Sequence, residues 1–185
     1  MKRIVTIVAA LLMAALTLTA QEAPKKYGIK SGMAKAMMSM LGQRVETTMY
    51  FDDYGALEAT VTTTAGVEVL SISRDGKTYI VNPGSRQVQE TPTPESVNYM
   101  DLNDEVMAKY KIKEIGKETV AGKECTQYEV EVTQAGQTVK TSVSVWEGFP
   151  MKTVANVMGM SLSMAVSEFV EGPVDASHFE IPKFE

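Results

Sequence analysis

The sequence predicts an α+β domain in which an antiparallel sheet of about ten strands is covered by one short helix. Three observations support this expectation. Apolar and polar residues alternate along most of the chain, which is typical of strands with one buried and one wet face. Turn motifs containing glycine separate these stretches, as in a series of hairpins. Only one segment shows a helical period.

The alternation is clearest in four stretches, each of which places β-branched or aromatic residues on one face. The side chains that we expect to share a buried face are Val45, Thr47, Met49 and Phe51; Leu57, Ala59 and Val61; Tyr128, Val130 and Val132; and Val139, Val143 and Val145. Polar residues occupy the positions between them, so each strand is expected to have one face in contact with water.

Seven short motifs are expected to form the turns between strands. They are DDYG (52–55), AG (65–66), RDGK (74–77), NPGS (82–85), AGK (121–123), QAGQ (134–137) and EGFP (147–150). Asp52 and Asp53 form a pair of carboxylates of the kind used in acid–base catalysis. Their place in a turn motif favours a structural role, because aspartate caps its own turn backbone.

The helical segment follows a loop rich in proline. Leu102, Val106 and Tyr110 are spaced four residues apart and predict an apolar stripe along one helix face. Asp101 or Asn103 is expected to cap its first turn. A single short helix among many strands is expected to cover one face of the sheet.

Residues 1–20 have the layout of a secretory signal peptide, with Lys2 and Arg3 before an apolar run that ends in small residues. We expect cleavage after Ala20 and export to the periplasm, and residues 21–185 suit a single domain. The leader holds two of the 18 basic residues and none of the 23 acidic ones, so the remaining net charge is about −7. This acidity argues against nucleic acid and anionic membranes as partners.

Methionine is abundant, with 13 residues, seven of which gather in two clusters, 33–40 and 158–164. Residues 154–166 are interpreted as one long strand that bends at Gly159. In the stretch VMGMSLSMAV, every large side chain then lies on one face, and only Gly, Ser and Ala lie on the other.

This methionine face has three interpretations. It can be packed core under the helix, because methionine fills irregular gaps. It can be an adaptable lining for an apolar ligand such as a lipid, since flexible thioethers suit ligands of varied shape. It can also bind Cu(I) through soft sulfur ligands. For the ligand interpretation, the expected lining is Met158, Met160, Leu162 and Met164, with Met38 and Met40 in second place.

No pattern in the sequence predicts catalysis, and we expect neither an enzyme nor a cofactor. His178 is the only histidine and Cys125 the only cysteine, so the usual zinc-binding sets are missing. A single cysteine in an exported protein forms no internal disulfide. We expect Cys125 to be a covered thiol that packs as a small apolar group.

Four stretches resemble exported bacterial proteins of unknown function of the DUF4412 type, whose fold is related to the LolA/LolB and RseB-like group. They are TMYFDDYG (48–55), IGKETVAGKECTQYEV (115–130), GFPMKT (148–153) and VDASHFEIPKFE (174–185). The resemblance implies a LolA-like domain, a strongly curved and incomplete antiparallel barrel whose open side is plugged by a helix. In the lipoprotein carriers of this group, the space between sheet and helix receives acyl chains.

These observations predict a non-enzymatic envelope protein that binds a lipid or another apolar ligand between sheet and helix. The alternative is an interaction or sensor module that binds another envelope protein through the edges or outer face of its sheet. The position of the apolar surface separates the two, because an internal cavity favours a carrier and an exposed patch favours a partner site.

Overall fold

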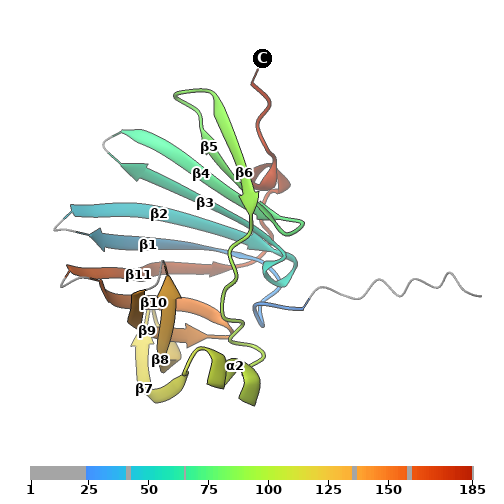
Figure 1. Ribbon diagram of the computed structural model, residues 1–185. Helices are drawn as coiled ribbons and strands as arrows, with labels where there is room; N and C mark the ends of the chain where they lie inside the picture. The colour runs from blue at the N-terminus through green and yellow to red at the C-terminus, as the bar shows by residue number, and fades with distance from the viewer. Residues whose placement is uncertain (1–23, 41–42, 65, 135–136, 158–159, 185) are drawn as a thin grey trace, which may run out of the picture.

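The computed structural model describes residues 24–40, 43–64, 66–134, 137–157 and 160–184. In this part of the chain, eleven strands form one antiparallel sheet, and one α-helix lies against it (Figure 1). The strands are β1 (Gly32–Met40), β2 (Gln43–Asp52), β3 (Leu57–Thr64), β4 (Val67–Arg74), β5 (Lys77–Asn82), β6 (Gln87–Pro92), β7 (Lys113–Val120), β8 (Lys123–Gln134), β9 (Gln137–Trp146), β10 (Phe149–Val157) and β11 (Met160–Glu171). The helices are α2 (Asp104–Lys109) and the short 3₁₀ turns η1 (Asp53–Gly55) and η2 (Ala176–Phe179).

The sheet consists of two meanders joined through the first and last strands. The strand order is β6-β5-β4-β3-β2-β1-β11-β10-β9-β8-β7, so β6 and β7 are the edges and the sheet is not closed. Residues 93–112 connect these two edges and carry α2 (Figure 1). The large antiparallel sheet with a short helix agrees with the sequence-based prediction, although the described strands number eleven.

The sheet is strongly curved around β1 and β11. The rings of Phe51 on β2 and Phe149 on β10 lie 5.4 Å apart, although β1 and β11 run between their strands. In a flat sheet, three strand spacings would separate them by about 14 Å. The first three side chains of β1 on this concave face are small, namely Gly32, Ala34 and Ala36. We call this concave surface the inner face.

Gly32 shows why small residues are needed on β1. A Cβ atom at this position would lie 2.8 Å from the carbonyl oxygen of Val170 on β11 and 3.0 Å from Cζ of Phe51 on β2, which is tighter than ordinary packing. A larger side chain would therefore push both neighbouring strands away from β1.

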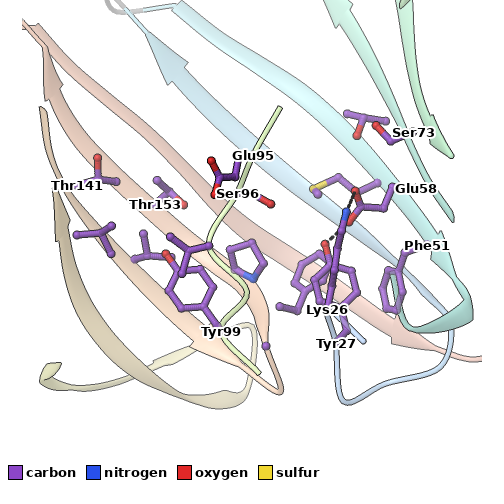
Figure 2. A pocket seen from close by; sticks show the side chains of 18 of the residues that line it. Lys26, Tyr27, Phe51, Glu58, Ser73, Glu95, Ser96, Tyr99, Thr141 and Thr153 are labelled. Carbon is purple, nitrogen blue, oxygen red and sulfur yellow. Dashed lines mark hydrogen bonds and ion pairs between the residues drawn. The ribbon is translucent and has the colours of Figure 1, made fainter. Parts of the chain in front are cut away.

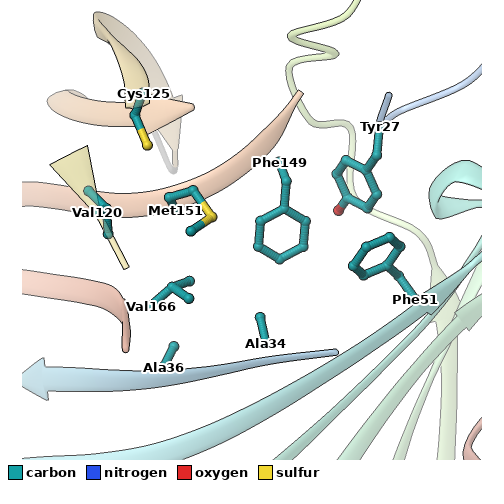
Figure 3. Close-up of a cluster of buried hydrophobic side chains, with 9 residues drawn as sticks. All are labelled: Tyr27, Ala34, Ala36, Phe51, Val120, Cys125, Phe149, Met151 and Val166. Atoms are coloured by element: carbon teal, nitrogen blue, oxygen red, sulfur yellow. The ribbon is translucent and has the colours of Figure 1, made fainter. Parts of the chain in front are cut away.

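The first core cluster lies inside the curve (Figure 3). Tyr27, Phe51 and Phe149 form its aromatic part, with neighbouring ring centroids 5.0–5.4 Å apart. Cys125 is fully buried in the same cluster, which confirms the prediction of a covered thiol. Burial raises the pKa of this thiol, so it stays protonated and unreactive at neutral pH.

Two further clusters bury opposite faces of the sheet. Ala59, Ile72 and Val81 form one on the outer face, where the C-terminal segment covers them with Phe179. The other lies on the inner face of β8 and β9, and its members are Ile112, Val130, Val143 and Val145. Residues of α2 cover this second cluster, as the sequence predicts for a single short helix.

Most of the expected local structure is confirmed. Asn103 caps α2 by accepting a hydrogen bond of 3.0 Å from the backbone N–H of Val106. Leu102 precedes this cap, so the helix is shorter than its apolar stripe suggested. Asp52 accepts a hydrogen bond of 2.7 Å from the N–H of Asp53, which confirms a turn role for this carboxylate.

The prediction of one long strand from residue 154 to 166 is wrong. β10 ends at Val157 and β11 begins at Met160, and these two residues pair with each other. The two residues between them, 158 and 159, lie outside the described part. Residues that pair across two neighbouring strands lie on the same face of the sheet. Because the chain turns back between β10 and β11, the positions of β10 that face inward differ from those expected for one continuous strand. Thr153 and Ala155 therefore share the inner face with Met164 and Leu162, whereas Val154 faces outward.

Candidate functional site

Residues 93–103, which we call the strap, cross the inner face from β6 to α2 (Figures 1 and 2). The N–H of Thr93 donates a hydrogen bond of 3.0 Å to the carbonyl of Gly76. Near the other end, the side-chain amide of Asn98 donates to the carbonyl of Lys25 at 3.1 Å. The strap is thus fastened to the β4–β5 turn at its start and to the N-terminal segment further along.

A cleft of about 460 Å³ lies between the strap and the inner face (Figure 2). One wall comes from β2, β3 and β4, with Met49, Phe51, Glu58, Thr60, Ser71 and Ser73. The opposite wall comes from β8, β9 and β10, with Val130, Thr141, Val143, Phe149 and Thr153. The strap contributes Glu95, Ser96, Val97 and Tyr99. Such a volume falls within the range of about 300–1,000 Å³ that is typical of small-molecule sites.

The two walls differ in chemistry. The wall of β3 and β4 presents hydroxyl groups, because Thr60, Ser71 and Ser73 take the inward positions of these strands. The hydroxyl of Ser73 lies 2.9 Å from that of Thr78. Among the described residues, the hydroxyls of Thr60 and Ser71 have no hydrogen-bond partner. The wall of β8 and β9 is more apolar, with Val130 and Val143 at its base.

One end of the cleft is held by a charged cluster beneath the aromatic core. The ammonium of Lys26 lies 3.0 Å from a carboxylate oxygen of Glu58, and the hydroxyl of Tyr27 donates to the other oxygen. Burial and the Glu58 charge raise the pKa of Tyr27 well above its usual value. Tyr27 therefore stays neutral, and its hydroxyl remains a donor to Glu58.

Two contacts hold the strap side of the cleft. Tyr99 stacks on Tyr128 of β8 with ring centroids 5.8 Å apart, and burial raises its pKa to about 12. Glu95 pairs with Lys109 of α2, whose hydrogen bond lowers the pKa of the Glu95 carboxyl. Tyr99 thus supplies an uncharged aromatic face, while Glu95 is ionised and already paired.

The structure brings the two methionine clusters together through the pairing of β1 with β11. Met38 pairs with Met164, and Met40 pairs with Leu162, on the same face as Ala36 and the core. Met164 packs against the first core cluster. The side chains of Met40 and Met160 and the whole of Met158 lie outside the described part.

Of the described side chains in these clusters, Met38 and Met164 lie beside the cleft on the same inner face. Thr153, which lines the cleft, is the cross-strand neighbour of Met164. Among the described side chains, Met49 is the methionine that lines the cleft itself. A ligand-lining role for the predicted set, and its alternatives as packed core or a Cu(I) site, stay predictions.

The strap and the hydroxyl wall could not be recognised from the sequence patterns. The alternation predicts a polar face in contact with water for Thr60, and no pattern indicates that the strap crosses that face. The available hint was the pair of prolines at positions 92 and 94 in the loop that leads to the helix, since the residue before a proline favours an extended backbone.

The described residues include no helix long and apolar enough to span a membrane. No protein-family model matches the sequence, and no curated protein matches it. Several solved structures do share its fold.

MucB of Pseudomonas aeruginosa, solved in complex with MucA, superposes with a TM-score of 0.54 and 16% identity over 82% of this chain and 56% of that one. A structure of MucB alone gives a TM-score of 0.54 and 15% identity over 83% of this chain and 57% of that one. An uncharacterised conserved protein from Thermus thermophilus gives a TM-score of 0.59 and 11% identity over 83% and 86% of the two chains.

The chain thus spans little more than half of the MucB chain. At these identities the likeness shows a shared fold alone, and this fold, an open and curved antiparallel sheet, is the one expected from the resemblance. Membership of the DUF4412 type stays a prediction.

Proposed function

We propose that this protein is a non-enzymatic envelope protein that binds a lipid or another apolar ligand between its curved sheet and the strap. The cleft of about 460 Å³ carries the proposal, because it is bounded by side chains of both halves of the sheet. Its apolar lining includes Met49, Val143 and Tyr99, as expected for a site that takes an apolar ligand.

The methionine stripe forms part of the same proposal. Met164 and Met38 are half-buried neighbours on the inner face, one strand beyond the cleft wall at Thr153. Unbranched thioethers adapt to chains of different length and shape. We therefore assign the extension of the site to Met158, Met160, Leu162 and Met164, with Met38 and Met40 beside them.

The proposed location is the periplasm, reached through cleavage after Ala20. Residues 1–20 lie outside the described residues, so this part rests on the sequence. The mass of protein secreted through its own leader tests it directly. A mature chain that begins at Gln21 supports the proposal, and an uncleaved chain contradicts it.

The ligand is tested by native mass spectrometry on secreted protein purified without detergent. We expect an added mass of several hundred daltons that is released as lipid on denaturation. The variant Thr60→Phe places a ring in the cleft and should lose this mass. Its matched control, Thr63→Phe, changes an exposed position of the same strand on the opposite face and should keep it.

If Thr60→Phe and Thr63→Phe carry the same added mass, the bound molecule lies outside the cleft. A copper-sized mass would instead favour the Cu(I) interpretation of the methionines. The absence of any added mass, together with no binding of apolar probes in solution, would contradict the proposed function.

A second candidate function is binding of a partner protein. The MucB structure with MucA shows a protein of this fold in a complex. On the outer face of β1 and β11, Met37 and Val170 are 41% and 46% exposed. The variants Met37→Glu and Val170→Glu should abolish capture of an envelope partner if this face binds one, while cleft binding persists.

A further inference from the structure

The hydroxyl wall of the cleft contains donors and acceptors that the fold does not use. Thr60 and Ser71 are direct cross-strand partners on β3 and β4, and both point into the cleft. Such partners have Cβ atoms about 5 Å apart. Because neither hydroxyl has a partner among the described residues, the wall presents two neighbouring free hydroxyl groups to a ligand.

The charges that line the cleft are already paired. Lys26 lies 3.0 Å from Glu58, and Glu95 pairs with Lys109. Lys26 is the one cation among the lining residues, so a phosphate or carboxylate would find no free positive partner there. An anionic head would also face the carboxylates of Glu58 and Glu95, which disfavour it.

A cationic head is disfavoured for a related reason. Glu58 already accepts hydrogen bonds from Lys26 and Tyr27. Glu95 is paired with Lys109 at the other side of the cleft. The two ammonium groups offset the charges of both carboxylates, so a cationic head would meet little net attraction there.

We infer that the ligand is a single-chain amphiphile with an uncharged head that carries neighbouring hydroxyl groups. Its acyl chain lies against Val130, Val143 and Tyr99, and its head meets Thr60 and Ser71. The inference rests on the proposed function and adds the chemical class of the ligand. A cleft of about 460 Å³ suits one chain rather than a lipid with several.

The test uses three probes that share one tail and differ in their head. They are monomyristoylglycerol, which is uncharged and has two neighbouring hydroxyls, myristate, which is anionic, and tetradecyltrimethylammonium, which is cationic. Each is titrated below its micelle concentration against the full protein loaded with the apolar dye N-phenylnaphthylamine. We expect the glyceride to displace the dye at a concentration at least tenfold lower than either charged probe.

The double variant Thr60→Val/Ser71→Ala removes both hydroxyls with little change in shape. Two lost neutral hydrogen bonds should weaken glyceride binding about tenfold and leave myristate and dye binding unchanged. Thr63→Val, on the same strand but the opposite face, is the matched control and should bind all probes like the unchanged protein.

The outcomes separate the two proposals. Tighter binding of a charged probe, or equal glyceride binding by the double variant, overturns the inference while the cleft remains a lipid site. Failure of the dye and of all three probes to bind overturns the proposed function as well. Equal losses in Thr63→Val and in the double variant would also overturn the inference, because the hydroxyl wall would then have no specific role.

Discussion

The two halves of the sheet bury opposite faces. In the half formed by β2–β5, the outer face is covered, and Ala59 and Ile72 are buried there under Phe179. In the half formed by β7–β10, the inner face is covered, and Val130 and Val143 are buried there under α2. Beyond Phe51 and the first core cluster, the inner face of β3 and β4 is therefore not covered by an apolar cluster, and the cleft occupies that space.

The difference follows from the residues at alternate positions. On β3, the outward residues include Leu57 and Ala59, while the inward ones include Thr60 and Thr62. On β9, the inward residues include Val143 and Val145. One continuous sheet thus has a hydroxyl-bearing inner surface in one half and an apolar inner surface in the other, and a ligand in the cleft would touch both.

The largest expected effect comes from the point where the two halves meet. Phe149 is fully buried and contacts the rings of Tyr27, Phe51 and Phe169 at 5.0–5.4 Å. Phe149→Ala should lower the free energy of unfolding by about 3–5 kcal/mol. Urea denaturation followed by circular dichroism measures this. Two separate transitions in the unchanged protein would show that the halves fold independently.

A second comparison concerns Phe179, which covers the outer face, and Val143, which lines the cleft on the inner face. Phe179→Ala should lower the free energy of unfolding by about 3 kcal/mol, because the ring covers the outer face. Dye binding per folded molecule should stay unchanged, since the cleft lies on the other face. Val143→Ala, which enlarges the cleft wall, should instead alter dye affinity. Equal changes of dye affinity in both variants would contradict the separation of the two faces.

A pair of glycines tests how the strap end of the cleft is closed. Gly122 and Gly148 each end a two-residue turn with positive φ, at 78° and 76°. A Cβ on Gly122 meets nothing within 4 Å, so Gly122→Ala should cost about 1 kcal/mol. A Cβ on Gly148 would lie 2.5 Å from the carbonyl oxygen of Lys26 and 2.6 Å from Cγ of Met100. Gly148→Ala should therefore cost about 2 kcal/mol more.

Thermal or urea unfolding of the two variants measures this difference directly. Equal destabilisation would mean that the N-terminal segment and the strap do not press on the β9–β10 turn. Dye binding provides the second readout, because displacement of Met100 moves the strap and should weaken binding only in Gly148→Ala.

The smallest effect concerns Glu118 on the edge strand β7. Glu118 accepts hydrogen bonds from Lys152 and Gln127 at 2.8 Å each, and also from Ser144. Above all the hydrogen bond from Lys152, and then that from Ser144, lowers the pKa of Glu118 below its ordinary value of 4.5. Its stabilising contribution is therefore complete above that value and is lost as the pH falls through the lower folded-state pKa.

Glu118→Gln should cost about 1 kcal/mol at pH 7, and this cost should shrink as the pH falls below 4.5 and the carboxylate becomes protonated. Urea denaturation of both proteins across this range measures the difference. A constant difference at every pH would show that the charge of Glu118 does not contribute. Glu124→Gln, at an exposed position of the edge hairpin, is the control and should show a much smaller dependence.

Local features could be predicted because they depend on neighbouring residues. Alternation placed Phe51, Ala59 and Val143 on buried faces, and the structure confirms each of them. The Asp75–Gly76 turn and the Asn103 cap follow from equally local chemistry. These elements would form in the same way in many different folds.

The long-range features could not be predicted from the same patterns. Alternation shows that a strand has two different faces, but it does not show which one is concave or what covers it. Thr60 and Val143 differ in chemistry and still share the inner face, since strand pairing through β1 and β11 connects them. That pairing joins residues as far apart in the sequence as Gly32 and Glu171.

The inward side chains of β1 grow in size along the strand, from hydrogen at Gly32 through methyl at Ala34 and Ala36 to the thioether at Met38. β1 therefore has its smallest side chains at its N-terminal end, and the neighbouring strands approach most closely there. None of these four residues lines the cleft. The width of the cleft therefore depends on a strand that contributes no residue to the described cleft lining.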